Sequence, residues 1–135
     1  MSALTRDRAT PYREGIEIEY PVAANTKIFA GALVCVNATG YAAPAADTSG
    51  YRFAGVAMEQ VDNSGGSGGA KVVRLRRAGV FEFDAVSITQ GMVGVDMYAA
   101  DDHTFDDTEG PTNDIRVGRL VKYVSATRGW IDIAR

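Results

Sequence analysis

The stretch that decides the fold is residues 86–133, VSITQGMVGVDMYAADDHTFDDTEGPTNDIRVGRLVKYVSATRGWIDI. Its short runs of alternating apolar and polar residues are separated by turns, which predicts strands and not helices. We expect a short strand at residues 95–99 and a closing strand pair at residues 115–124 and 130–134. No set of side chains in the stretch predicts a catalytic site, so it indicates a small all-β protein that works through its surface.

The residues upstream carry strand patterns of two kinds. Residues 16–22 (IEIEYPV) alternate apolar and acidic side chains, which predicts a strand with one buried face. Residues 32–37 (ALVCVN) are almost continuously apolar, which predicts a strand buried on both faces. After a turn at residues 37–40, residues 41–44 are expected to return as the hairpin partner of that strand.

Two longer segments follow, with a glycine-rich loop between them. Residues 52–61 (RFAGVAMEQV) predict one strand, and residues 62–69 (DNSGGSGG) predict a flexible loop. Residues 71–77 and 80–84 alternate about Gly79, and their apolar side chains share one phase. Arg77 is charged but falls on the apolar phase, so we expect a bulge or bend near Gly79.

Size and composition are those of one folded domain. The chain has 135 residues, of which 46% are hydrophobic and 23% charged. We expect an N-terminal arm at residues 1–15 and a single β-domain at residues 16–135, built as a small sandwich or partly open barrel. The one helical candidate is a turn around residues 85–90, where the periodicity is weak.

Charge and cysteine content exclude several classes of protein. The formal net charge of −3 argues against nucleic-acid binding by phosphate neutralisation. Cys35 is the only cysteine, so no intramolecular disulfide forms and a reducing compartment is expected. No signal peptide is recognisable, and no apolar run approaches the roughly 20 residues that span a bilayer. We therefore expect a soluble protein made in the cytoplasm, with no membrane partner.

The first fifteen residues differ from the rest because charges crowd around Pro11 with few apolar residues. One interpretation is a frayed terminus, as in most domains. The other is an arm that becomes ordered against a neighbouring subunit, because arginine and tyrosine are enriched at interfaces. The candidate contact residues of such an arm are Arg6, Arg8, Tyr12 and Arg13.

Charge is also distributed in blocks along the β-domain. Residues 96–114 contain seven acidic residues and no Lys or Arg, whereas residues 71–77 and 116–128 are basic. This segregation suits electrostatic docking between copies or with an oppositely charged partner. The alternative is two solvated faces of one sheet. The candidates for inter-subunit electrostatic contact are Arg74, Arg76, Asp101, Asp102, Asp106 and Asp107.

Little in the chain predicts chemistry. His103 is the only histidine, so any histidine-dependent catalytic site must use it, and the candidate polar cluster is His103 with Asp106 or Glu109. Cys35 lies in an apolar run and is expected to be a small core residue. We therefore expect no enzyme activity, no catalytic residue and no cofactor.

Two further patterns partly resemble ligand sites. Asp101, Asp102, Asp106 and Asp107 offer the oxygen ligands that Ca²⁺ prefers, but the EF-hand spacing and its glycine are absent. The glycine-rich loop lacks the Gly-Lys-Ser/Thr sequence at a helix start that a phosphate-binding loop needs. We expect no metal site and no phosphate site.

The strand and turn residues resemble the small capsid decoration (cement) proteins of tailed bacteriophages, over roughly residue 20 to the C-terminus. The most specific pieces are Gly40-Tyr41, Phe53-Ala54-Gly55-Val56-Ala57, Val117-Gly118-Arg119-Leu120-Val121 and the terminal Trp-Ile-Asp-Ile. The resemblance implies a compact β-tulip-like domain on the outer surface of the phage head, synthesised in the host bacterial cytoplasm. It further implies a homotrimer at the three-fold positions that clamps neighbouring copies of the major capsid protein, often through an extended N-terminal arm. It assigns no role to the acidic segment.

A second class stays open: a β-barrel module that binds a ligand or nucleic acid without catalysis. Such a module places aromatic side chains beside basic ones on one exposed sheet face. The aromatic candidates are Tyr41, Tyr51, Phe53 and Tyr123, although no single strand combines them with arginine.

Overall fold

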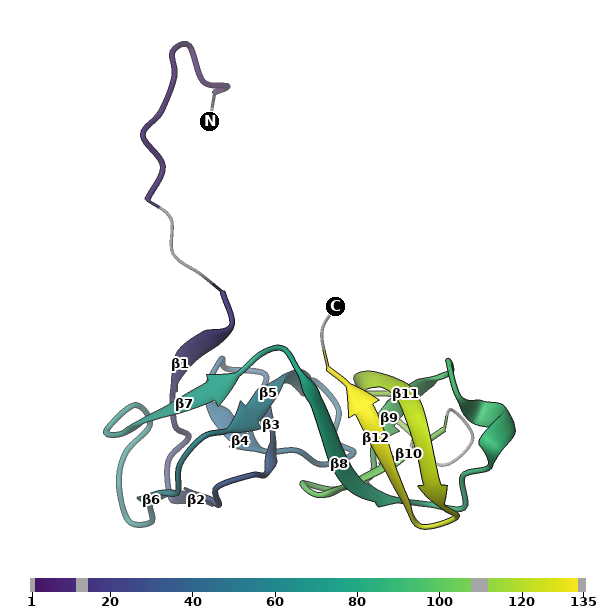
Figure 1. Ribbon diagram of the computed structural model, residues 1–135. Coiled ribbons are helices and arrows are strands. Elements are labelled where there is room, and N and C mark those ends of the chain that lie inside the picture. The colour runs from purple at the N-terminus through teal and green to yellow at the C-terminus, as the bar shows by residue number, and fades with distance from the viewer. Residues whose placement is uncertain (1, 12–14, 108–111, 134–135) are drawn as a thin grey trace.

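The structure is a computed structural model that describes residues 2–11, 15–107 and 112–133, and the fold is all-β, as expected (Figure 1). One short 3₁₀ helix, η1 (Gln90–Met92), interrupts the strands of the described residues. The strands are β1 (Glu17–Pro21), β2 (Thr26–Ile28), β3 (Leu33–Val36), β4 (Ala42–Pro44), β5 (Arg52–Ala57), β6 (Val61–Asn63), β7 (Val72–Arg76), β8 (Val80–Ala85), β9 (Asp96–Ala99), β10 (Thr104–Asp106), β11 (Arg116–Ser125) and β12 (Arg128–Asp132). Within the described ranges, no helix is long and apolar enough to cross a membrane.

The N-terminal half of the β-body is an antiparallel sheet with the strand order β1-β7-β5-β3-β4. Just after β1, Val22 forms a parallel bridge with Ala42 of β4. The backbone N–H of Ala23 donates to the carbonyl oxygen of Ala42 at 2.9 Å. The two outer strands of the sheet therefore meet at one end, and the sheet curls. The separate pair β2-β6 lies beside it.

The C-terminal half is a closed barrel with the strand order β10-β8-β12-β11-β9. The expected closing pair is present as the antiparallel β11–β12 hairpin. Closure depends on β10, which lies inside the acidic segment and pairs with β8 in parallel and with β9 antiparallel. The acidic segment is therefore partly a structural strand of the barrel.

The strand β3 is buried on both faces, as its apolar run predicted. Leu33 and Cys35 pack in the core that fills the barrel, whereas Val34 packs in a second core within the curled sheet. All three side chains are fully buried. Burial raises the pKa of the Cys35 thiol to about 12, so this thiol stays protonated and acts as a core residue, as expected.

The prediction of one strand at residues 52–61 is wrong. The strand β5 ends at Ala57, and β6 starts at Val61 and pairs with β2 instead of a strand of the large sheet. The reason is the change of strand partner, because Val56 and Ala57 pair with β7, whereas β6 pairs with β2. The weak helical candidate at residues 85–90 is also displaced, to η1.

The bend expected near Gly79 is present. The strand β7 belongs to the curled sheet and β8 to the barrel, and Gly79 lies between them with φ of +127°, a conformation that favours glycine. The apolar side chains on either side share a phase but not a core. Val73 and Leu75 pack in the second core, whereas Phe83 packs in the barrel core.

The glycine-rich loop is tied to the sheet by a buried asparagine. Its expected first residues, Asp62 and Asn63, belong to β6, so the loop is shorter than predicted. The Asn63 side chain is 2% exposed, and its Nδ2 donates to the carbonyl oxygens of Ala23 at 2.9 Å and Ser67 at 3.0 Å. One side-chain amide thus joins the glycine-rich loop to the segment between β1 and β2.

We expect Asn63→Ala to lower the free energy of unfolding by about 2 kcal/mol, because carbonyl oxygens that are buried with the amide lose their donor. Urea unfolding followed by circular dichroism measures the change. The matched control is Ser67→Ala, which removes an exposed side chain and keeps the carbonyl acceptor. Equal midpoints for the two variants would contradict this role of Asn63.

Candidate functional site

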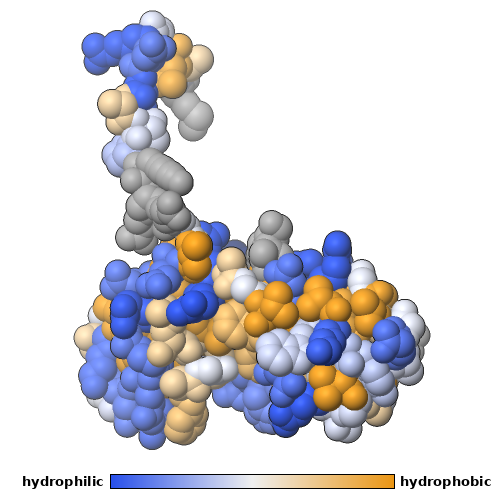
Figure 2. Space-filling view, viewed as in Figure 1, coloured by the Kyte–Doolittle hydropathy of each residue, from blue (hydrophilic) through white to orange (hydrophobic). Residues whose placement is uncertain are grey.

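The N-terminal segment of residues 2–11 stands away from the β-body (Figure 1). Every residue in it is exposed, and Leu4 is 74% exposed. Its hydrogen bonds are internal: Arg8 Nη1 donates to Thr10 Oγ1 at 3.0 Å, and the Thr10 N–H donates to the Arg8 carbonyl oxygen at 2.9 Å. Figure 2 shows hydrophilic residues on one side of the tip of this segment and hydrophobic residues beside them. The segment is therefore free to contact a partner.

Two of the four candidate contact residues of the arm lie within the described part of the chain. The side chains of Arg6 and Arg8 are exposed. Tyr12 and Arg13 lie outside the described residues. The arm therefore offers at least two solvent-exposed guanidinium groups on an extended chain, a donor type suited to carboxylates.

The base of the arm is fixed to the curled sheet. The Arg77 N–H donates to the carbonyl oxygen of Ile16 at 2.7 Å, and Arg77 Nη1 donates to the carbonyl oxygen of Gly15 at 3.4 Å. The strand β1 then pairs with β7 over its full length. The sheet thus sets the side of the molecule from which the arm leaves.

The basic strand β7 lies opposite acidic residues of the same chain. In the β1–β7 register, Arg74 is opposite Glu19 and Arg76 is opposite Glu17. Arg74 Nε also lies 3.6 Å from Glu59 Oε1. Exposed pairs of this kind contribute about 0–1 kcal/mol. Arg74 and Arg76 are therefore exposed but locally compensated, and an inter-subunit role for them stays a prediction.

The acidic segment also pairs within the chain. Asp96 Oδ1 lies 3.0 Å from Arg116 Nη2 and 3.9 Å from Arg119 Nε, between adjacent strands of the barrel. The turn before β10 is attached to the other half of the molecule, because the Leu33 N–H donates to the Asp102 carbonyl oxygen at 2.8 Å. Blocks of charge that are separate in sequence thus meet in the fold.

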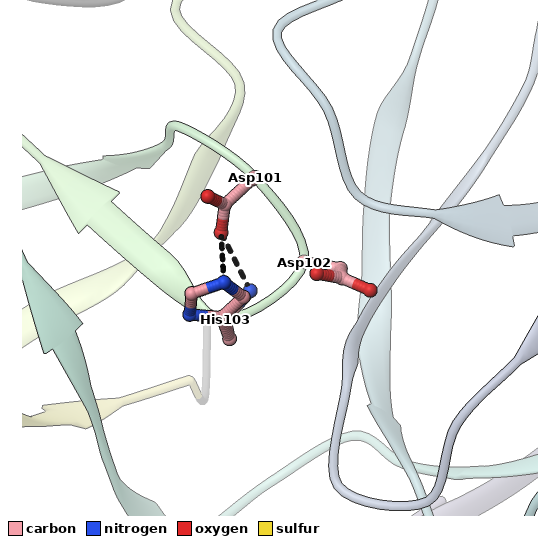
Figure 3. A group of neighbouring side chains, drawn as sticks. All are labelled: Asp101, Asp102 and His103. Atoms are coloured by element: carbon pink, nitrogen blue, oxygen red, sulfur yellow. Dashed lines mark hydrogen bonds and ion pairs between the residues drawn. The ribbon is translucent and has the colours of Figure 1, made fainter.

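His103 lies in a charge cluster at the surface of the barrel (Figure 3). Its Nδ1 is 3.0 Å from Asp84 Oδ2, and its Nε2 is 3.5 Å from Asp101 Oδ1. Arg128 joins Asp84 at 3.2 Å and Glu82 at 2.8 Å. The hydrogen bond with Asp84 raises the pKa of His103, and the nearby aspartate charges act in the same direction.

This geometry does not match the expected acidic partners of His103. Asp106 Oδ1 accepts the Asp107 N–H at 2.7 Å instead, and Glu109 lies outside the described residues. The sequence offered no signal for Asp84, because the contact depends on the parallel β8–β10 pairing.

The cluster lacks the order of groups in a Ser-His-Asp site, which needs a carboxylate on one imidazole nitrogen and a hydroxyl on the other. Thr104 Oγ1 lies 3.1 Å from Nδ1, the nitrogen that also meets Asp84. The His103 side chain is 63% exposed. The arrangement is suited to holding the turn before β10 on β8 and not to activating a nucleophile.

Among the described residues, Asp101, Asp102 and His103 form a group whose possible metal ligands lie within 4.8 Å of one another. In Figure 3, Asp101 faces His103, whereas the Asp102 side chain extends away from both. The expected absence of a metal site therefore stays a prediction.

The comparisons with known proteins give no match: no family model, no curated protein and no solved structure matches the chain.

We expect His103 to titrate above the ordinary value of about 6.5, because Asp84 stabilises the imidazolium. The stabilisation is then complete below about pH 6.5 and is lost as the pH rises through the raised pKa. NMR measures this pKa without overlap, since His103 is the only histidine. Asp84→Asn should lower the pKa, and the control Asp106→Asn should leave it nearly unchanged. A pKa that does not respond to Asp84→Asn would refute the assignment.

Proposed function

We propose that this chain is a capsid decoration (cement) protein of a tailed bacteriophage. It binds the outer surface of the head and stabilises contacts between subunits of the major capsid protein. The observation that carries the proposal is an exposed N-terminal arm on a compact all-β body. The resemblance of the strand and turn residues to cement proteins supports the same role.

The arm needs a partner on energetic grounds. Ordering a backbone costs about 1–2 kcal/mol per residue, and residues 2–11 bury nothing on their own body that would offset this cost. A capsid surface supplies the missing contacts, with Arg6 and Arg8 donating charge-assisted hydrogen bonds. Tyr12 and Arg13 are proposed as the further contacts of the arm.

Charge and symmetry support a position on the outside of the shell. A chain of net charge −3 is repelled by packaged DNA, which favours the outer surface over the lumen. The proposed assembly is a homotrimer at three-fold lattice positions. Each interface can then be modest, because three linked sites bind a symmetric lattice with avidity.

The alternative of a ligand- or nucleic-acid-binding module is less favoured by the packing. Phe53 is buried in the barrel core, Tyr51 and Tyr123 pack against the same core, and Tyr41 is half-buried. None of the four aromatic side chains is fully exposed, which disfavours a stacking platform.

Co-sedimentation with heads tests the proposal. Purified protein is mixed with DNA-filled heads and with expanded empty heads built from the major capsid protein of the same genome. Saturable binding at a stoichiometry of three copies per three-fold position is the expected result. Absence of binding to either head, or a genome that encodes no major capsid protein, would overturn the proposal.

Deleting residues 2–14 should weaken binding to heads by about tenfold or more, since removing one buried anchor costs on the order of 2 kcal/mol. The melting temperature should stay nearly unchanged, because the described arm contributes no core residue.

The double variant Arg6→Ala with Arg8→Ala should give part of the loss of head binding. The matched control is Arg119→Ala with Lys122→Ala, which removes the same charge from exposed positions of β11 and shows whether the loss of positive charge alone explains the weaker binding. A truncated chain that decorates heads like the full chain would show that the arm is only a frayed end.

A further inference from the structure

A groove of about 490 Å³ lies on the body next to the base of the arm. Its apolar lining comes mainly from β1, β3, β5 and the residue after β12, with Tyr20, Phe53 and Ile133 as its largest apolar side chains. Arg52, at the start of β5, and Arg77, just after β7, border it. The volume falls in the range of about 300–1,000 Å³ that is typical of ligand sites.

The charged side chains that line the groove are all positive. Among the nine residues that line it, the ionisable ones are Arg52, Arg77 and the Tyr20 phenol. Both arginine side chains are exposed, and the Arg77 guanidinium donates a hydrogen bond to the uncharged carbonyl of Gly15. Two guanidinium groups over an apolar floor suit an anionic group attached to an apolar one, since arginine binds carboxylates in a planar, two-pronged geometry.

The groove and the arm lie on one side of the molecule. Gly15, at the base of the arm, is itself part of the groove lining. The arm and the C-terminal end of β12 leave the body on the same side in Figure 1. A surface gripped by the arm therefore comes to lie over the groove. The exposed arginines of this side, Arg6, Arg8, Arg52 and Arg77, contrast with the net negative charge of the chain.

We infer that the groove receives an acidic, partly apolar segment of the capsid protein, with its carboxylates on Arg52 and Arg77. This inference rests on the proposed function and adds a second contact to the arm. The arm supplies reach, and the groove fixes the orientation of the body on the shell. Since the two contacts are joined in one chain, the second forms at high effective concentration once the first has formed.

The test compares two charge-matched double variants of the full chain in co-sedimentation with heads. Arg52→Gln with Arg77→Gln removes the charge of the groove. Arg119→Gln with Lys122→Gln removes two exposed charges of β11, outside the groove lining. We expect the first pair to weaken binding by about tenfold or more and the second by less than about threefold. The single variant Arg52→Gln keeps the Arg77–Gly15 contact and should also weaken binding. This variant separates the loss of groove charge from an effect of Arg77 on the base of the arm.

Circular dichroism melting confirms that each variant is folded, and light scattering reports its oligomeric state. If the groove variants bind heads like the unaltered chain, the groove inference is wrong and the proposed function stands. If they instead lose self-association while head binding by the remaining copies is unchanged, the groove holds a second copy and the inference is also wrong. If the unaltered chain itself fails to bind heads, the proposed function has failed, which is a different result.

Discussion

The fold depends on one strand that both halves of the molecule must share. The side chains of β3 alternate between the barrel core, which receives Leu33 and Cys35, and the second core, which receives Val34. Its backbone pairs with β4 on one side and with β5 on the other, and the Leu33 N–H holds the turn before β10. Burying side chains of this size contributes roughly 1.5–3 kcal/mol each. Neither core is complete without this strand, so the curled sheet and the barrel stabilise each other.

The sequence predicts strands well where the local hydrophobic pattern is sufficient, and poorly where a distant strand partner determines the bounds of the strand. The continuous apolar run around Val34 predicted burial on both faces, and the hairpin closing with β12 was expected, because both features are local. An alternation with a period of two residues shows which side chains share a face of the strand, but not which core that face contacts. The run through Val56 and Val61 therefore predicts one strand, because the pattern does not show that β6 pairs with β2. In the same way, the shared phase on both sides of Gly79 does not show that the side chains enter two different cores. The contact of His103 with Asp84 and the groove between Arg52 and Arg77 depend on long-range pairing, which no spacing in the sequence reveals.

The charged residues of the barrel and those of the arm differ in their partners. Asp96 meets Arg116, and Arg128 meets Glu82 and Asp84, so many charges of the barrel are compensated within the chain. Exposed guanidinium groups remain on the arm and beside its base. A body with internally paired charges has little electrostatic preference of its own, and specificity then depends on the side that carries the arm.

The pairing of β1 with β7 also determines how the molecule carries load. The arm enters β1 at Glu17, and Glu17 is opposite Arg76, the residue at which β7 turns toward the barrel. A pull between the arm and the barrel therefore acts on one end of this ladder and opens it like a zipper, one pair at a time, instead of straining all pairs together. Release of the five residues of β1 would lengthen the tether by roughly 16 Å, at about 3.3 Å per residue, while the barrel stays closed. If the chain has the proposed cement role, an expanding shell meets an extensible connection before it meets a rigid one.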